Sequence, residues 1–286
     1  MTNPYTARRR KRPKGHLAAI IAAITVAFLA GYMLKVMASS KDDRDTAVTT
    51  EAIVPADIDL LYVRLPDGTD NSDLDYTGFR IGFNASMHEP NYAAWELDSA
   101  RLDGTASRKD AKFQSDPDVD GCATLADYRN SGYDRGHMVP AADMKWDEQA
   151  MHDCHYLTNI APQQQQLNTG AWNSLEGLCR KWAARYGRLV VVTGPVLTDE
   201  ITTFIGPSQV AVPSRYYKVV LAPDLAEPMG IGFIMPNRYV EGGVQASAVT
   251  IDQVEAVTGI DFFSELPDSI ENIVESQARF HKWNTR

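Results

Sequence analysis

The chain has 286 residues, 44% of them apolar and 23% charged, and a formal net charge of −9 at pH 7. This length and apolar content are enough for a full hydrophobic core, in one large domain or two small ones, and they exclude a chain that is disordered throughout. Residues 1–40 hold seven of the 28 Lys and Arg and no acidic residue, so the remainder carries 21 basic against 37 acidic side chains, a net charge of −16. This acidic remainder argues against tight nucleic-acid binding through a broad basic face.

The N-terminal region combines a basic cluster with a long uncharged run. Residues 8–14 include six Lys or Arg, and residues 17–34 carry no charge over 18 positions, close to the length that spans a bilayer as a helix. The positive-inside rule then predicts a basic cytoplasmic tail over residues 1–16, a transmembrane signal anchor over residues 17–37 and an extracytoplasmic body, periplasmic or extracellular. A cleaved signal peptide, which would give a secreted protein, and an organelle-targeting leader are the alternatives.

Polar, aperiodic sequence over residues 38–57 predicts a flexible stalk, so the folded domain is expected over residues 58–286. Strands are expected where apolar or aromatic runs are bounded by turn residues, at 60–63, 76–83 and 92–97. Residues 101–132 are rich in Asp, Gly and Ser, a composition typical of a long functional loop.

The second half of the chain contains both helical and strand patterns. A short helix is expected over residues 147–153 and a long central one over residues 168–186, closed by Gly187. The β-branched run at 188–193 predicts a buried strand. Two more strands are expected at 216–221 and 229–235, a short helix near 253–258 and a helical tail from 269. This order favours an α+β fold, with mixed or antiparallel sheets layered around the central helix.

Residues 133–143 contain the sequence Asp134-Arg135-Gly136-His137, followed shortly by a Pro-Ala-Ala loop. Histidine is the side chain best suited to accept a proton near neutral pH, so His137 is a candidate general base. Gly136 permits a bend or a close approach of the backbone beside it. Taken alone, this motif also fits a surface turn with a structural histidine.

A second motif lies in the predicted central helix, where Asn168, Trp172, Glu176 and Arg180 recur every four positions and would share one helical face. An amide oxygen, a carboxylate and a guanidinium on one face suit a hard cation bound beside a phosphate. Simpler structural interpretations exist as well. Asn168 is a good helix N-cap, Glu176 and Arg180 have the spacing of an exposed ion pair, and Trp172 suits core packing.

Together with residues 156–163, the two motifs resemble the DNA/RNA non-specific endonuclease family, which includes mitochondrial endonuclease G and secreted bacterial nucleases. The resemblance extends from about residue 76 to residue 263. It implies a ββα-metal nuclease fold for residues 58–286. It also implies Mg²⁺-dependent hydrolysis of phosphodiester bonds in DNA and RNA, with little sequence preference and with 5′-phosphate products.

The resemblance also implies roles for particular residues. His137 corresponds to the general base of the family and Asn168 to its magnesium ligand, with Mn²⁺ as the alternative ion. A single amide ligand suits Mg²⁺, which keeps several of its waters. Glu176 would hold waters bound to the metal.

Arginines would bind the phosphate in such a site. Arg180 and Arg135 are the candidates for holding the scissile phosphate or stabilising the charge that develops on it. For Arg135, an ion pair with Asp134 or a contact with a neighbouring loop is the structural alternative. Some members of the family have a further phosphate-binding arginine upstream, in a region that corresponds to residues 107–113, where no single residue is assigned.

His152, Cys154 and His155 also invite a zinc interpretation. Their spacing is tighter than that of the usual paired ligands and no second Cys/His pair lies nearby in the sequence, so a zinc site is disfavoured. The chain has three cysteines, which allow at most one internal disulfide, and free buried thiols are the expectation.

The sequence therefore predicts a metal-dependent endonuclease with DNA and RNA as substrates and the membrane as a partner through residues 17–37. A homodimer is a further expectation. Two alternatives stay open: a phosphodiesterase acting on a smaller phosphate ester, which the acidic remainder favours, and a catalytically inactive, membrane-tethered binding module.

Overall fold

The computed structural model describes residues 54–283, which belong to one folded unit. The predicted cytoplasmic tail, the predicted anchor over residues 17–37 and nearly all of the predicted stalk lie outside the described residues. No helix within residues 54–283 is long and apolar enough to cross a membrane.

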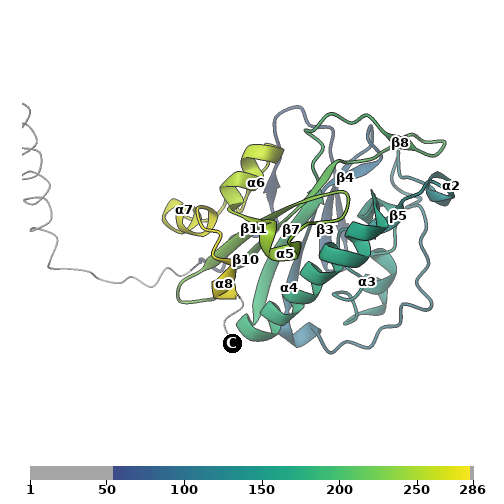
Figure 1. Cartoon of the computed structure of the whole chain (residues 1–286). Helices are drawn as coiled ribbons and strands as arrows, with labels where there is room; N and C mark the ends of the chain where they lie inside the picture. The colour runs from purple at the N-terminus through teal and green to yellow at the C-terminus, as the bar shows by residue number, and fades with distance from the viewer. Residues whose placement is uncertain (1–53, 284–286) are drawn as a thin grey trace, which may run out of the picture. The chain divides into compact units, whose positions relative to one another are not determined.

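The centre of the domain is a seven-stranded sheet in which every neighbouring pair of strands is antiparallel (Figure 1). The predicted strands at 188–193, 216–221 and 229–235 are neighbours in this sheet, as β7, β10 and β11. From edge to edge the strands are β12 (Ala248–Val249), β11 (Met229–Pro236), β10 (Arg215–Ala222), β7 (Arg188–Pro195), β4 (Glu89–Asp98), β3 (Phe79–Asn84) and β2 (Ser72–Tyr76). The α+β class with an antiparallel sheet is confirmed.

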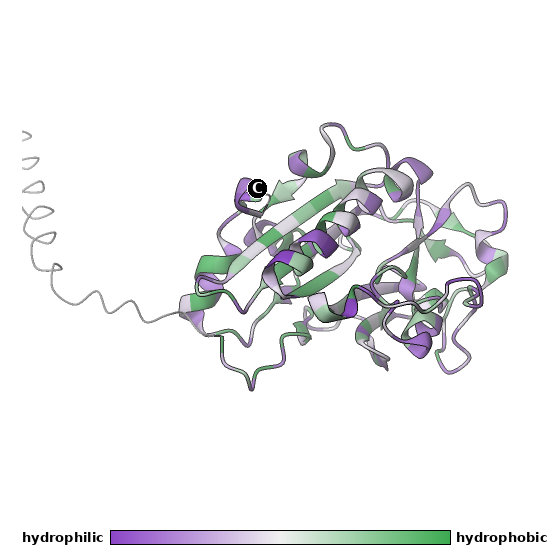
Figure 2. Cartoon of the chain, turned by 90° about the horizontal axis from the view of Figure 1, so that it is seen from below, coloured by the Kyte–Doolittle hydropathy of each residue, from purple (hydrophilic) through white to green (hydrophobic). Residues whose placement is uncertain are grey.

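Helices cover both faces of the sheet (Figure 1). Alternate side chains of a strand point to opposite faces, so Val191 packs in one core with Leu175 of α4, while Val190 packs in a second core with Ile251 of α6. Because both faces are covered, the central strands are hydrophobic along most of their length (Figure 2). The covering helices are α4 (Asn173–Tyr186), α6 (Ile251–Thr258) and α7 (Asp268–Glu275).

Two short strands precede α4 and form a ββα unit with it. β5 (Asp134–His137) pairs antiparallel with β6 (Ile160–Gln163), which leads through a π-helical turn, η3 (Leu167–Trp172), into α4. The predicted start of the central helix is therefore wrong, because the backbone at Gly170 is non-helical, with φ −101° and ψ −111°, and α4 begins only at Asn173. The end of the helix is as predicted: Gly187 follows Tyr186 with a φ of 91°, which favours glycine.

Short elements complete the described chain. The predicted strand at 60–63 is reduced to the two-residue β1, and residues 102–132 are irregular apart from α2 and an isolated bridge at Gln114. The remaining strands are β1 (Val63–Arg64), paired with β13 (Asp261–Phe262), and β8 (Phe204–Ile205), paired with β9 (Val210–Ala211). The remaining helices are η1 (Ser99–Arg101), α2 (Leu125–Tyr128), α3 (Glu148–Asp153), η2 (Leu157–Asn159), α5 (Gly243–Ala246) and α8 (Phe280–Trp283).

Candidate active site

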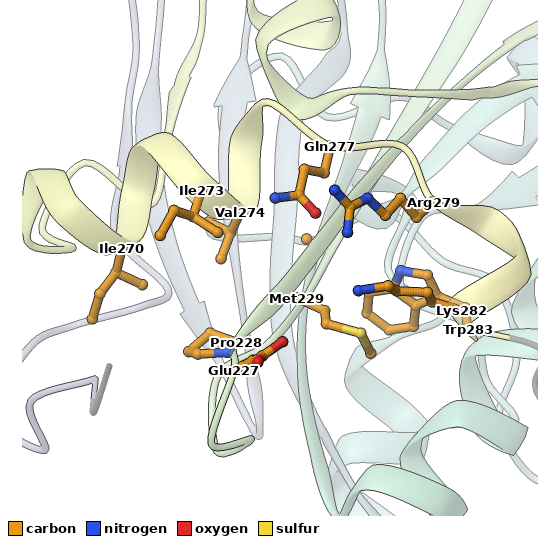
Figure 3. Close-up of a pocket in the computed structure, with 11 residues that line it drawn as sticks. Glu227, Pro228, Met229, Ile270, Ile273, Val274, Gln277, Arg279, Lys282 and Trp283 are labelled. Carbon is orange, nitrogen blue, oxygen red and sulfur yellow. The ribbon is translucent and has the colours of Figure 1, made fainter. Parts of the chain in front are cut away.

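Two hollows of the domain differ in chemistry. One, of about 370 Å³, lies between α7, α8 and the start of β11, has apolar side chains such as Ile270 and Met229 in its wall (Figure 3), and contains none of the predicted site residues. The other, of about 560 Å³, lies beside β5 and contains Asp134, Arg135 and Asn168. We call it the cleft; it is lined by Arg108, Phe113, Leu125, Tyr128, Arg129, Tyr133, Asp134, Arg135 and Asn168.

The cleft concentrates positive charge on an otherwise acidic domain. Arg108, Arg129 and Arg135 all line it with exposed side chains. Within residues 54–283, none of the three has a carboxylate within 4.0 Å. Arg135 instead lies over the ring of Phe113 at 4.5 Å, so it does not pair with Asp134. Unpaired guanidinium groups around one hollow suit a phosphate ligand.

Strand β5 directs its side chains to opposite sides. Arg135 and His137 share one side, where Phe113 contacts both: the Arg135 guanidinium carbon is 4.5 Å and the His137 ring centre 5.1 Å from its ring centre. Gly136 faces β6, and a Cβ at this position would lie 2.3 Å from the Gln163 side chain. Glycine is therefore required here for the close approach of β5 to β6.

The backbone around His137 is held by buried side chains. Its carbonyl oxygen accepts a hydrogen bond from Nε1 of Trp172 at 3.2 Å, which fits the expected core position of this tryptophan. Asn159 fixes the backbone two residues after His137, because its side chain accepts a hydrogen bond from the Val139 N–H at 2.9 Å and donates one to the Val139 carbonyl at 3.0 Å. Burial lowers the pKa of His137 well below its ordinary value, and nearby positive charges act in the same direction. The neutral imidazole is the form that accepts a proton.

Asn168 lies within the π-helical turn and not at the N-cap of a helix. Its Nδ2 donates a hydrogen bond to Oδ2 of Asp134 at 2.9 Å. The N-cap interpretation is therefore wrong: Gln166 precedes the turn, and the Asn168 side chain bonds to another strand. Because the amide nitrogen of Asn168 is hydrogen-bonded to Asp134, the amide oxygen is the atom that can bind a ligand in the cleft. An oxygen held in this way suits a hard divalent cation.

Glu176 and Arg180 are half-buried and belong to one charge group with the buried Asp143 and Lys218. Arg180 Nη1 contacts Oδ1 of the buried Asp143 at 2.7 Å, so its ion-pair partner is Asp143 and not Glu176. Burial raises the pKa of Glu176 to about 7, with repulsion from Asp143 acting in the same direction and attraction to Lys218 opposing it. The positive charge of Arg108, which lines the cleft, lowers the pKa of both Glu176 and His137.

Two members of this charge group were not predicted. Lys218 is 1% exposed and lies between the rings of Trp95 and Trp172, at 5.0 Å and 4.5 Å from their centres. Burial lowers its pKa, and attraction to Glu176 and to Asp143 opposes that shift. One feature of the sequence distinguishes this lysine: it is the one charged residue of the otherwise uncharged run 216–222. Asp143, at the end of the first motif, carried no such signal.

The upstream region that the sequence left unassigned is now placed. Arg108 and Phe113, from residues 107–113, both line the cleft. Arg129, which no pattern had indicated, lies there too, because it follows α2. The cleft thus joins residues from three separated segments of the chain.

Comparison with known proteins decides the family. The model of the family described as DNA/RNA non-specific endonuclease matches residues 57–269. The chain belongs to this family. Its members are nucleases that hydrolyse phosphodiester bonds, and the family is generally dependent on divalent metals.

Curated relatives and a solved structure agree with this assignment. Nuclease EXOG, mitochondrial, of Danio rerio is 37% identical over 207 residues, which cover 67% of this chain and 60% of the relative. Endonuclease G, mitochondrial, of Homo sapiens is 34% identical over 181 residues, 58% of this chain and 61% of the relative. These matches thus span about 60% of the length of each relative. A crystal structure of an EndoG/EndoGI complex aligns with a TM-score of 0.65 and 26% identity, over 69% of this chain and 87% of that one.

The predicted location of the domain, anchored in a membrane outside the cytoplasm or secreted, is wrong. EXOG of Danio rerio and of Mus musculus and endonuclease G of Homo sapiens are all named as mitochondrial nucleases. The run of uncharged residues on which the prediction depended lies outside the described residues.

Proposed function

We propose that this chain is a metal-dependent endonuclease that hydrolyses phosphodiester bonds of DNA and RNA with little sequence preference. One arrangement supports this proposal most directly. The neutral His137 on β5 and the Asn168 amide, held by Asp134, lie in one ββα unit beside a cleft lined by unpaired arginines. A base, an oxygen ligand for a cation and a phosphate-binding surface are the parts that phosphodiester hydrolysis requires.

Asn168 is the proposed ligand of Mg²⁺ or, alternatively, Mn²⁺. The fit follows from the hydrogen bond to Asp134, which leaves the amide oxygen to a ligand in the cleft. A single protein oxygen suits an ion that keeps several waters, and the half-buried carboxylate of Glu176 would hold such waters. When bound, the ion polarises a phosphate oxygen and offsets the negative charge of the transition state.

His137 is the proposed general base. Its Nε2 is buried without a hydrogen-bond partner, so we assign Nδ1 as the nitrogen that takes a proton from the attacking water. The water oxygen then forms a bond to phosphorus, while the bond between phosphorus and the 3′ oxygen breaks. The 3′ oxygen leaves with the bonding electrons and takes a proton from solvent, which gives a 3′-hydroxyl and a 5′-phosphate. Arg135 would hold the phosphate through its unpaired guanidinium, and Arg180 through the N–H groups that Asp143 does not take.

Cleavage of a plasmid and of single-stranded RNA tests the proposal. We expect both to be cleaved with Mg²⁺ and neither to be cleaved with EDTA. His137→Ala should reduce turnover by about 10²–10⁴-fold, the usual contribution of a positioned base. The matched control is His281→Ala, at an exposed position on α8 far along the chain from the motif. Undiminished cleavage by His137→Ala, or in EDTA, would overturn the proposed mechanism.

The same preparation tests the alternative substrate class, a smaller phosphate ester. If a simple phosphodiester such as a nitrophenyl ester is hydrolysed while plasmid and RNA stay intact, the substrate class proposed here is wrong. An inactive binding module would leave all three substrates intact.

A further inference from the structure

A second cluster of metal-binding side chains includes the proposed base. His137, Cys154 and His155 each offer one ligand atom, and these atoms all lie within 4.8 Å of one another. We propose that these three residues form a site for a borderline transition-metal ion such as Zn²⁺, and that its occupation switches off the nuclease. The inhibitory part of this inference rests on the proposed function of His137.

The trio differs from the one that the sequence suggested. His152 is engaged elsewhere, since its Nε2 lies 2.8 Å from Nε2 of Gln114. Its place is taken by His137, which comes from β5 and is brought to Cys154 and His155 by the pairing of β5 with β6. A cluster of this kind has no spacing signature, because His137 lies on strand β5 and the other two ligands lie in the turn after α3.

His155 is prepared to bind a metal. Its Nδ1 lies 2.8 Å from the carbonyl oxygen of Met151, and because a carbonyl only accepts, the ring donates its proton there. The lone pair is therefore on Nε2, which is buried and has no hydrogen-bond partner. Ligating histidines usually donate their other N–H to a carbonyl or carboxylate, which fixes the tautomer in this way.

His137 offers the second unpartnered nitrogen. Its Nε2 is also buried without a hydrogen-bond partner, and its ring meets that of His155 edge-on, with 5.0 Å between the ring centres. Phe113 covers both rings, at 5.1 Å and 5.2 Å. Buried nitrogens are rarely left without a partner, so one on each of two contacting rings favours a ligand at this position.

Cys154 supplies the third ligand atom. It is fully buried, is not part of a disulfide, donates to the Met151 carbonyl at 3.2 Å and lies 3.4 Å from Nδ1 of His155. On metal binding the thiol proton is released to solvent and a metal–sulfur bond forms. A tetrahedral zinc site has ligand atoms roughly 3.4–3.7 Å apart, given metal–ligand bonds of about 2.0–2.3 Å. Ligand atoms that lie up to 4.8 Å apart here would therefore move closer together on binding.

The ligand types separate this site from the proposed magnesium site. Two imidazoles and a thiolate favour Zn²⁺ and similar ions, whereas the amide oxygen of Asn168 favours Mg²⁺ or Mn²⁺. A metal on Nε2 of His137 keeps the remaining ring proton on Nδ1, so the nitrogen assigned as the base has no lone pair for the water proton. Inhibition should therefore not be relieved by excess Mg²⁺.

Metal binding is measured first without reference to activity. We expect the full chain to take up about one equivalent of Co²⁺ with a thiolate-to-cobalt absorption band, which added Zn²⁺ abolishes. Cys154→Ser should lose the band and His155→Phe should weaken binding by at least about tenfold. Cys122→Ser and His152→Asn are the matched controls and should keep the band. Absence of the band in the unmodified chain overturns the proposed site, even if the chain proves to have no nuclease activity.

Inhibition is measured next, on plasmid cleavage at saturating Mg²⁺. Zn²⁺ near one equivalent should reduce the rate of the unmodified chain by at least about tenfold, the effect expected when a general base is removed. Cys154→Ser and His155→Phe should cleave with Mg²⁺ but lose this sensitivity. If one variant fails to fold, as judged by thermal unfolding, the other still decides. Equal inhibition of the unmodified chain and a folded variant would place the zinc effect elsewhere and overturn the switch.

Discussion

Asn168 donates its side-chain amide to the carboxylate of Asp134 at 2.9 Å, and this bond joins the turn before α4 to the first residue of β5. The strand that carries His137 and the helix that carries Glu176 are thus connected at their ends. Gly136 closes the gap between β5 and β6 on the other side. The geometry of the candidate site therefore depends on Asp134, which the sequence suggested only as an ion-pair partner of Arg135.

The first prediction concerns Asp134. Asp134→Ala removes the acceptor for the Asn168 amide, so the amide can rotate and its oxygen is no longer fixed toward the cleft. We expect the Mg²⁺ concentration for half-maximal cleavage to rise by about 10–100-fold, as for other groups that orient a metal ligand. The measurement is a Mg²⁺ titration of plasmid cleavage. Asp67→Ala, in an exposed turn, is the control. An unchanged titration for Asp134→Ala would show that the bond does not orient the ligand.

The second prediction concerns the charge group that includes Glu176. Lys218 and Arg180 balance Glu176 and Asp143, so Lys218→Met leaves one buried carboxylate uncompensated. We expect the free energy of unfolding to fall by about 0.5–3 kcal/mol, because Lys218 attracts the two carboxylates without a direct ion pair to either. Urea unfolding measures it, and Lys181→Met, exposed on the same helix as Glu176, is the control.

A double variant separates charge balance from packing. Adding Glu176→Gln to Lys218→Met restores neutrality, so part of the lost stability should return. If the double variant is as unstable as the sum of the two single variants, the lysine acts through its packing between Trp95 and Trp172 and not through its charge.

The third prediction concerns Glu275 on α7, which packs on the face of the sheet opposite to α4. Burial raises the pKa of Glu275 to about 9, and repulsion from Glu255 acts in the same direction. In the unfolded chain this carboxyl ionises near its ordinary value of 4.5, so between pH 4.5 and 9 the folded state binds more protons. Stability should therefore fall as the pH rises through this range.

Glu275→Gln isolates that contribution, because it removes the titrating group but keeps its shape. The variant should be more stable than the unmodified chain at pH 9, and the difference should shrink toward pH 5. Thermal unfolding across this pH range measures it. Glu200→Gln, at an exposed loop position, should leave the pH dependence unchanged. A constant difference between Glu275→Gln and the unmodified chain at all pH values would contradict the assignment.

The sequence predicted the parts of the fold that are set by local pattern. The β-branched run of β7 and the glycine that ends α4 gave correct elements because burial on both faces and a positive φ leave direct signals. Strand β5 gave none, since four residues of the type Asp-Arg-Gly-His have no apolar alternation, and their pairing with β6 is set by contacts distant in sequence. The turn at Gly170 broke an apparently regular helical spacing for a similar reason.

The candidate site shows the same division. His137 and Asn168 were found from motifs, and the structure places both in one ββα unit. Arg129 and Asp143 were missed, because nothing in their local sequence distinguishes them from surface charges. Only the fold brings Arg129 to the cleft and buries Asp143 against Arg180.

The last prediction concerns how an acidic domain binds a polyanion. Three arginines line the cleft while the net charge outside residues 1–40 is −16, so few phosphates are neutralised and long-range attraction is weak. The slope of log affinity against log salt is about −0.9 per phosphate neutralised in duplex DNA, so we expect a slope no steeper than about −3. Binding of a short duplex to His137→Ala, followed by fluorescence anisotropy over a range of salt concentrations, measures it.

Removing one arginine at a time tests whether the salt dependence of binding arises from contacts in the cleft. Arg129→Ala should weaken binding of DNA and RNA to a similar degree and make the slope shallower by about one, because it removes a contact to phosphate and none to a base. Lys181→Ala, on α4 and outside the cleft, should leave the slope unchanged. A slope well beyond −3 that persists in Arg129→Ala would mean that lysines and arginines outside the cleft contact the duplex. Nucleic acid would then be bound over a much wider surface than the arrangement of Arg108, Arg129 and Arg135 predicts.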